Sequence, residues 1–107
     1  MPETATATLT AGPIQLDHAA HEVRVHGVEI HVPLREFQLL AVLLREAGRV
    51  ITRRDLIREV WGEDYVGDTR TLDVHVRRLR ERLEDDPHNP VWITTIRGVG
   101  YKIRVRP

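Results

Sequence analysis

Residues 69–84, with the sequence TRTLDVHVRRLRERLE, combine the densest run of arginines with the clearest helical pattern in the chain. At about 100° per residue, the apolar side chains form one narrow stripe that a helix would bury, made of Leu72, Val76, Leu79 and Leu83. The opposite face carries Arg70, Val74, Arg77 and Glu81, with Thr71 and Arg78 beside them. An arginine can donate two hydrogen bonds to O6 and N7 of guanine, and a valine methyl can contact the thymine methyl. This face is therefore chemically suited to a DNA major groove.

The same pattern also fits a solvated helix surface that binds nothing. Pairs at i,i+4 spacing, such as Asp73 with Arg77, stabilise an isolated helix by only roughly a few tenths of a kcal/mol. Taken alone, the helical pattern favours neither interpretation, a nucleic-acid interface or a plain solvated face. Its start is better defined, because Asp68 or Thr69 can accept hydrogen bonds from the free amides of the first turn.

Basic charge is concentrated in the C-terminal part of the chain. The formal net charge is zero, with 16 Lys or Arg against 16 Asp or Glu. Residues 1–69 hold 7 basic and 11 acidic side chains, whereas residues 70–107 hold 9 and 5. The segment that begins with the arginine-rich helix therefore carries a balance of +4. For a nucleic-acid partner, such a local basic patch matters more than the total charge.

Length and composition exclude several classes of protein. A chain of 107 residues forms one domain. It contains neither cysteine nor serine, which excludes disulfides, thiolate metal sites and serine nucleophiles. No pair of carboxylates converges in the sequence, so we expect no enzyme activity and no cofactor. The N-terminus lacks the features of a signal peptide and no apolar run reaches the length of a membrane span, so we expect a cytoplasmic location.

The histidines of the N-terminal part could suggest a metal site. They are His18, His21, His26 and His31. They fall in different predicted strands and turns, whereas metal ligands normally show tighter spacing and a supporting shell. We therefore do not expect a metal site.

The first 32 residues predict a small antiparallel sheet after a short linker. Residues 1–6 carry no periodicity and resemble a linker or a frayed terminus, so we place the folded domain at residues 7–107. Apolar and polar residues then alternate with period two in four short runs between residues 8 and 32, which predicts strands with one buried face. His26 and Gly27 separate the last two runs and indicate a tight hairpin.

Two further helices are expected before the arginine-rich one. Residues 33–47 change to a helical period with a wide apolar face, and Pro33 suits the start of a helix. After a short apolar link at residues 50–51, Thr52 and Asp55 resemble a capping box that begins a second helix.

Residues 91–105, VWITTIRGVGYKIRV, predict a β-hairpin with Arg97 and Gly98 at its tip. Gly98 and Gly100 form only a lone GxG pattern with no helix after it, so we assign both to turn geometry rather than to a phosphate-binding loop. An arginine at a hairpin tip directly after an arginine-rich helix is typical of a winged helix. In such a domain the helix enters the major groove and the wing reaches the neighbouring minor groove.

Four segments, in order and spacing, resemble the C-terminal effector domain of OmpR/PhoB-family response regulators. They are LREFQLLAVL at residues 34–43, GRVITRRDLIREVWG at 48–62, DTRTLDVHVRRLRERLE at 68–84 and TIRGVGYK at 95–102. The resemblance covers residues 14–103. It implies an α+β winged helix-turn-helix fold with an N-terminal four-stranded antiparallel sheet, three helices and a C-terminal β-hairpin wing.

The resemblance also implies sequence-specific binding of double-stranded DNA by a transcription regulator that is the output domain of a phosphorelay. On that basis Val74 and Arg78 are expected to face bases, and Arg97 is expected to enter the minor groove. The remaining expected contacts are to phosphates or sugars, or support the DNA backbone from the second helix and the hairpin: Arg53, Trp61, Arg70, Thr71, His75, Arg77, Arg80 and Thr95.

Further partners follow from the resemblance. It implies a second copy bound in tandem on direct repeats, and contact with RNA polymerase through the loop of Glu63, Asp64, Tyr65, Val66 and Gly67. It also implies a phosphoacceptor receiver domain, which the sequence lacks, so the chain is either a separated effector domain or a naturally short protein. A winged helix that binds a protein instead of DNA is the alternative, which replacement or neutralisation of the exposed arginines would favour.

Overall fold

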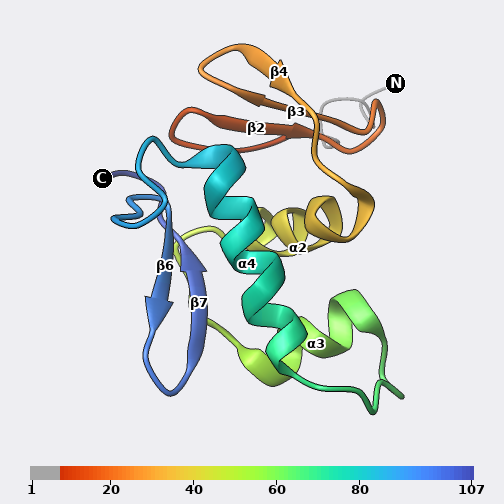
Figure 1. The fold of residues 1–107 in the computed structure, drawn as a ribbon. Helices are drawn as coiled ribbons and strands as arrows, with labels where there is room; N and C mark the ends of the chain where they lie inside the picture. Colours follow the sequence, from red (N-terminus) through yellow and green to blue (C-terminus); the bar gives the residue numbers. More distant parts are fainter. Residues whose placement is uncertain (1–7) are drawn as a thin grey trace.

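A computed structural model describes residues 8–107 of the chain. Figure 1 shows one small sheet above three helices and a second sheet beside them. The linker expected at residues 1–6 and the first residue of the expected domain lie outside the described residues. The described part has the predicted α+β architecture of a four-stranded antiparallel sheet, three helices and a C-terminal hairpin.

The N-terminal sheet consists of β1 (Thr8–Ala11), β2 (Ile14–Asp17), β3 (Glu22–Val25) and β4 (Val28–Ile30), each antiparallel to the next. Period-two alternation places Ile14, Leu16 and Val23 on the buried face. The hairpin between β3 and β4 turns at His26 and Gly27, whose φ angles are 52° and 80°. Two consecutive positive φ angles are typical of a two-residue type I′ turn, so the predicted hairpin is confirmed.

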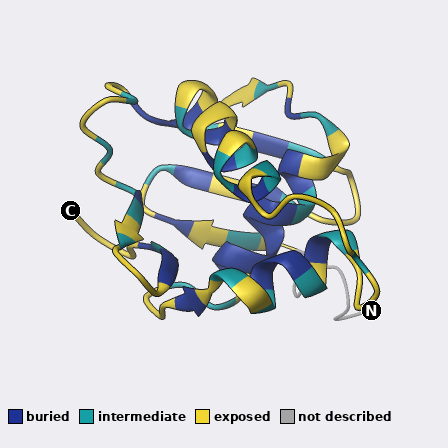
Figure 2. Cartoon of the chain, turned by 60° about the horizontal axis from the view of Figure 1, so that its bottom comes forward, coloured by how far each residue is buried: buried dark blue, intermediate teal, exposed yellow. Residues whose placement is uncertain are grey.

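Three helices form the centre of the domain: α2 (Leu34–Arg45), α3 (Arg53–Trp61) and α4 (Arg70–Leu83). Figure 2 shows buried positions on one side of the helices and exposed positions on the other. α2 is the most deeply buried, because its wide apolar face contacts the N-terminal sheet as well as α3 and α4. The helix predicted at residues 33–47 is confirmed, with Pro33 just before its first turn. Within residues 8–107, no helix is both long and apolar enough to traverse a lipid bilayer.

Side chains cap the starts of α3 and α4. Thr52 Oγ1 accepts the backbone N–H of Asp55 at 3.1 Å, which is one half of the predicted capping box. The Asp55 carboxylate instead pairs with Arg58 at 2.7 Å. At α4, the N-cap residue Thr69 makes no side-chain cap hydrogen bond. The capping oxygen comes from the residue before it, because Asp68 Oδ1 accepts the backbone N–H of Arg70 at 2.9 Å.

The C-terminal sheet has three strands in the order β5, β7, β6. They are β5 (Ile51–Thr52), β6 (Ile93–Ile96) and β7 (Gly100–Ile103), all antiparallel to their neighbours. We call β6, β7 and the turn at residues 97–99 the wing, and this hairpin confirms the prediction. The prediction of a plain apolar link at residues 50–51 is wrong at Ile51, because that residue begins β5. Two residues are too few to show a strand period.

The two glycines of the wing serve different purposes. Gly98 has a φ of 77° and lies in the turn, as predicted. Gly100 lies in β7, where a Cβ atom would approach the carbonyl oxygen of Ile51 to 1.9 Å. The assignment of Gly100 to turn geometry is therefore wrong, since its small size is needed for the close pairing of β7 with β5.

Two buried carboxylates hold the C-terminal end of α4, and sequence analysis did not find either. Glu36 of α2 is only 3% exposed and accepts a hydrogen bond from Arg82 Nε at 2.8 Å. Glu84 accepts backbone N–H groups of residues 91–93 at 2.7–3.2 Å, which ties the end of α4 to the start of β6. Each charge is satisfied where it is buried, as burial of a carboxylate requires.

The packing at Gly100 yields a first prediction. Gly100→Ala should lower the free energy of unfolding by about 3 kcal/mol, because the new methyl group would push β5 away from β7. Gly27→Ala is the matched control, since no atom of residues 8–107 outside its own neighbourhood lies within 4 Å of its Cβ position, while its φ of 80° opposes the change. That control should lose about 1 kcal/mol. Urea unfolding measures both, and equal losses would contradict the steric explanation.

Candidate nucleic-acid interface

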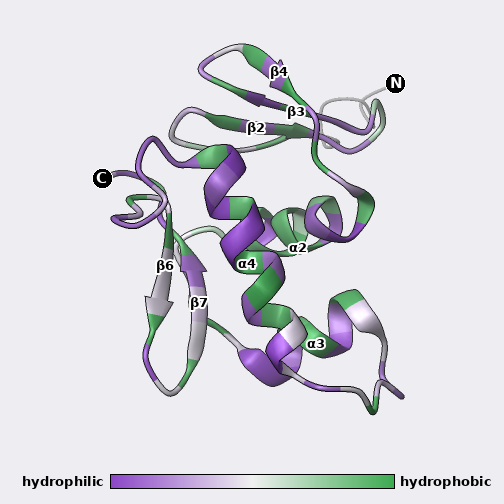
Figure 3. Cartoon of the chain, viewed as in Figure 1, coloured by the Kyte–Doolittle hydropathy of each residue, from purple (hydrophilic) through white to green (hydrophobic). Residues whose placement is uncertain are grey.

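α4 presents its arginines to solvent because its opposite side is completely packed. The predicted stripe of Leu72, Val76, Leu79 and Leu83 is buried, as expected. The outward face includes the exposed residues Val74, Arg77 and Arg78. Figure 3 shows hydrophilic and hydrophobic positions interleaved along α4, which is the pattern of a helix with two unlike faces.

The arginines predicted to contact DNA differ in whether they already form ion pairs or hydrogen bonds within the protein. Within residues 8–107, the exposed side chains of Arg78 and Arg97 have no ion pair or hydrogen bond with the protein. The side chain of Arg77 is 81% exposed and lies 3.8 Å from Glu81, which is a loose surface pair. Arg78 and Arg97 are therefore the guanidiniums of the predicted set that are most available to a ligand.

Arg70 is exposed but paired with Asp68. Its Nε and Nη2 atoms donate to the Asp68 carboxylate at 2.9 and 2.6 Å. These hydrogen bonds lower the pKa of Asp68 to about 2, so the carboxylate is ionised at neutral pH. A phosphate bound by Arg70 would have to replace Asp68 or share the guanidinium with it.

Arg53 at the start of α3 is bound to α4. Its Nη1 and Nη2 atoms donate to the two oxygens of Asp73 at 2.5 and 3.0 Å, and Nη2 also donates to the Thr69 carbonyl at 3.2 Å. The Tyr101 hydroxyl of β7 donates to the same Asp73 carboxylate. The hydrogen bond from Arg53 lowers the pKa of Asp73, while burial and Asp73 raise the pKa of Tyr101 to about 12. Tyr101 is therefore a protonated donor at neutral pH.

Arg80 connects α4 to the wing. Its Nε donates to the Ile93 carbonyl at 3.0 Å, and its Nη2 donates to Thr95 Oγ1 at 2.8 Å. Its guanidinium carbon lies 5.7 Å from the centre of the Tyr101 ring, within the range of a cation–π contact. Two predicted DNA contacts, Arg80 and Thr95, thus bind each other in the absence of DNA.

Trp61 and His75 pack together behind the start of α4. Their ring centres are 5.1 Å apart in a T-shaped arrangement, and the Arg35 guanidinium lies 5.6 Å from the Trp61 ring. His75 Nδ1 lies 2.7 Å from the Thr71 carbonyl oxygen and must carry a proton there, because a carbonyl only accepts. These side chains therefore support the position of the first turns of α4.

The predicted polymerase-contact loop projects from between α3 and α4. Val66 is 97% exposed, and the Glu63 carboxylate lies 3.7 Å from Arg58 with its side chain mostly in solvent. Tyr65 anchors the loop, because its hydroxyl donates to the Asp68 carbonyl at 3.1 Å. The loop thus offers acidic and apolar groups where α4 offers arginines.

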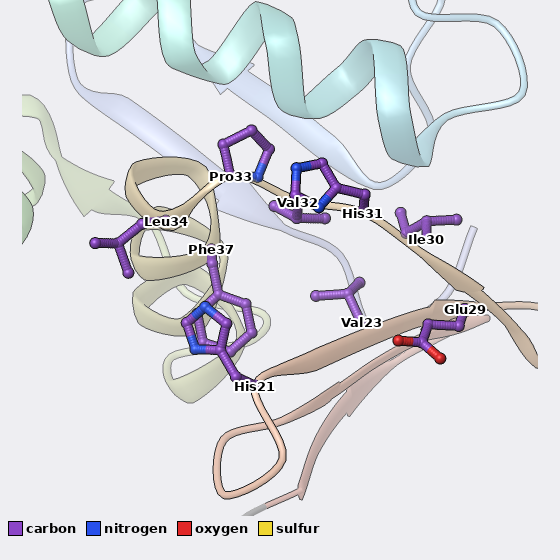
Figure 4. A pocket seen from close by; sticks show the side chains of 9 residues that line it. All are labelled: His21, Val23, Glu29, Ile30, His31, Val32, Pro33, Leu34 and Phe37. Carbon is purple, nitrogen blue, oxygen red and sulfur yellow. The ribbon is translucent and has the colours of Figure 1, made fainter.

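A cavity lies away from these arginines, between the N-terminal sheet and α2. Its volume is about 480 Å³, and Figure 4 shows His21 over Phe37 at one side of it. The two rings are stacked with centres 3.9 Å apart. Among residues 8–107, no three His, Cys, Asp or Glu side chains are arranged to hold a metal ion. His21 is thus engaged in packing.

Asp73 and Tyr101 are the residues of this surface that sequence analysis missed. Their partners are 20 and 28 positions apart along the chain, so neither helical nor strand periodicity indicates the contact. Asp73 falls beside the outward face of its helix, where a carboxylate has the ordinary explanation of a surface pair.

The fold and the arginine surface together define a winged helix-turn-helix domain. Residues 27–103 match the family model described as "Transcriptional regulatory protein, C terminal". The chain belongs to this family, which comprises the DNA-binding output domains of OmpR/PhoB-type response regulators.

Among proteins of known sequence, the chain is 58% identical over 95 residues to the sensory transduction protein RegX3 of Mycolicibacterium smegmatis, covering 89% of this chain and 42% of that protein. It is 54% identical over 101 residues to RegX3 of Mycobacterium leprae, covering 94% of this chain and 51% of that protein. The chain thus spans about half, or less, of these curated relatives.

Solved structures agree with this assignment. The Thermotoga maritima response regulator DrrB, an OmpR/PhoB homologue, matches with a TM-score of 0.83 and 38% identity over 92% of this chain and 44% of that one. The RstA DNA-binding domain of Klebsiella pneumoniae, solved in complex with the RstA box, matches with a TM-score of 0.83 and 29% identity. The match covers 92% of this chain and 98% of that one.

The hydrogen bonds of Asp73 with Arg53 and Tyr101 yield a prediction for how stability depends on pH. The pKa of Asp73 is lowered in the folded state, so its ionised form stabilises the fold above its ordinary pKa of 3.8. This contribution is lost as pH falls through the folded pKa. Asp73→Asn, which cannot titrate, should therefore be less stable than the parent by about 1 kcal/mol at neutral pH, allowing for partial exposure.

The difference between the parent and Asp73→Asn should shrink towards zero as the pH is lowered below 3.8. Asp85→Asn, at an exposed position, is the control and should follow the parent throughout. Urea unfolding across the acid range measures all three proteins. A difference that stays constant with pH would contradict the role of the Asp73 charge.

Proposed function

We propose that this domain binds double-stranded DNA sequence-specifically, with α4 in the major groove and the wing turn at residues 97–99 in the adjacent minor groove. The observation that carries the proposal is the exposure of Arg78 and Arg97, which have no partner within residues 8–107. The start of α4 and the wing turn both lie at the lower edge of Figure 1, so one duplex can meet both. The solved complex of the related RstA domain with its DNA supports the same use of the fold.

The two arginines suit different grooves. Arg78 follows Val74 by one helical turn on the outward face of α4, where its planar guanidinium can donate to the O6 and N7 atoms of a guanine. Arg97 lies at a hairpin tip, and the minor groove offers arginine a strong negative potential but only a degenerate pattern of bases. Helix and wing therefore contribute different kinds of recognition.

The other predicted DNA contacts are assigned by the hydrogen bonds and packing that each side chain already makes within the protein. Arg70 and Arg77 are exposed and lie on the face of α4 that would meet DNA, so we assign both to phosphates. Thr71, His75, Trp61, Arg80 and Thr95 support α4 and the wing from within, with any contact to DNA made by their remaining polar groups.

We extend the proposal to the larger protein and its partners. The curated relatives are about twice as long as this chain, which supports a receiver domain and a phosphorelay as the source of the activating signal. Two copies would bind in tandem on direct repeats. The protein would work in the cytoplasm, where it meets DNA and RNA polymerase, and the domain itself would carry no enzyme activity.

The DNA-binding proposal predicts that two alanine variants lose affinity in different ways. A binding site is first selected from a pool of random duplexes. Arg78→Ala should then relax preference at one or two base positions by about 1–3 kcal/mol. Arg97→Ala should weaken binding with little change in base preference, except at an A/T-rich flank.

The measurement is a binding profile over all single-base variants of one selected half-site. Arg24→Ala is the matched control, because it removes an exposed arginine from β3 on the far side of the domain. If Arg78→Ala lowers affinity uniformly while Arg97→Ala changes preference at the centre of the site, the assignment of grooves is wrong. Failure of the parent to bind any duplex would favour a protein-interaction module instead.

The acidic loop generates a separate prediction. Replacing Glu63 and Asp64 by Ala should leave affinity for the selected duplex within about twofold, because neither residue lies on α4 or the wing. Transcription activated from that site in a reconstituted system should fall. A double variant at the exposed residues Glu29 and Asp85 makes the same change of charge and should activate normally. Unchanged activation by the loop variant would remove the polymerase-contact role.

A further inference from the structure

Hydrogen bonds with α3 and α4 hold the wing, in addition to the pairing of β7 with β5. Tyr101 of β7 donates to Asp73 of α4, and Arg80 of α4 donates to the Ile93 carbonyl of β6. The wing turn is held as well, because the backbone N–H of Arg53 donates to the Val99 carbonyl at 3.1 Å. Pairing of β7 with β5 and the bonds of Glu84 fix the base of the wing, and these contacts with α3 and α4 further restrict where its tip lies.

Arg53, the first residue of α3, is hydrogen-bonded to both the wing turn and α4. Its backbone binds the wing turn, and its guanidinium binds both oxygens of Asp73 and the carbonyl of Thr69 at the start of α4. The planar fork of arginine makes such a two-point contact rigid. Because these N–H groups are used inside the protein, Arg53 is better suited to fixing geometry than to binding phosphate.

We infer that Asp73, Tyr101 and Arg53 are positioning residues that fix the separation between α4 and the wing tip. They thereby set the distance along the DNA between the base that Arg78 contacts and the minor-groove step that Arg97 enters. This inference rests on the proposed DNA-binding function. These residues would then determine specificity without touching a base. In a duplex where the minor-groove step is displaced relative to the base that Arg78 contacts, both arginines cannot bind at once.

The expected selectivity follows from the dimensions of DNA. Moving the A/T-rich minor-groove step by one base pair displaces it by about 3.4 Å along the axis. A wing held by these contacts cannot follow such a shift without breaking hydrogen bonds. A wing released from Asp73 can move further, and it should tolerate the displaced step.

Tyr101→Phe isolates the contact, because it removes the hydroxyl that binds Asp73 and keeps the buried ring beside Arg80. Thr94→Val is the matched control, since it removes a hydroxyl that donates within the wing, to the Lys102 carbonyl at 3.2 Å. Asp73→Asn is a second test variant at a partly exposed position. Unfolding midpoints are measured for each protein so that all are compared folded.

The experiment measures affinity for three duplexes, which carry the A/T-rich step in the selected register or shifted by one base pair in either direction. The parent and Thr94→Val should lose about tenfold on a shift, whereas Tyr101→Phe and Asp73→Asn should lose about threefold or less. An equal penalty in the parent and both test variants overturns the positioning role while leaving DNA binding intact. A parent that binds the selected duplex but is indifferent to the shift also overturns it, and a parent that binds no duplex overturns the proposed function together with this inference.

Discussion

Burial of the apolar stripe of α4 is the constraint on which the rest of the surface depends. Leu72, Val76 and Leu79 are fully inaccessible, and α2 contacts the same helix from the other side of the core. A rotation of α4 by one residue, about 100°, would expose leucines and turn arginines into the core. Because that exchange is so unfavourable, the outward direction of the arginine face is set by packing.

Within that frame, the arginines are divided between structure and recognition. Arg53, Arg80 and Arg82 are used by carboxylates and carbonyl groups of neighbouring elements, so they join α3, α4, the wing and α2. Arg78 and Arg97 keep their donors free among the described residues. A chain of zero net charge can therefore still offer a basic surface. Acidic residues on other elements balance the total, and only local charge acts on a bound polyanion.

Much of the fold could be predicted from the sequence because its signals are local. The strand alternation around Ile14 and Val23 and the helical stripe of α4 each depend on residues a few positions apart. What could not be predicted depends on distant pairs. β5 is too short to show a period. Gly100 must stay small because of a carbonyl 49 residues earlier in the chain, and the buried Glu36 is paired with Arg82, 46 residues later. The same limit applies to the interface, where the exposed Arg97 was predictable and the bond between Asp73 and Tyr101 was not.

The most direct test of this division is a crystal structure of the domain bound to a duplex selected from random DNA. The Arg78 guanidinium should lie about 3 Å from the O6 and N7 atoms of a guanine. In the same complex, Arg53 should still be hydrogen-bonded to Asp73, with the Tyr101 hydroxyl on that carboxylate. A complex in which Arg53 has left Asp73 for a phosphate, while Arg78 remains in solvent, would contradict the account.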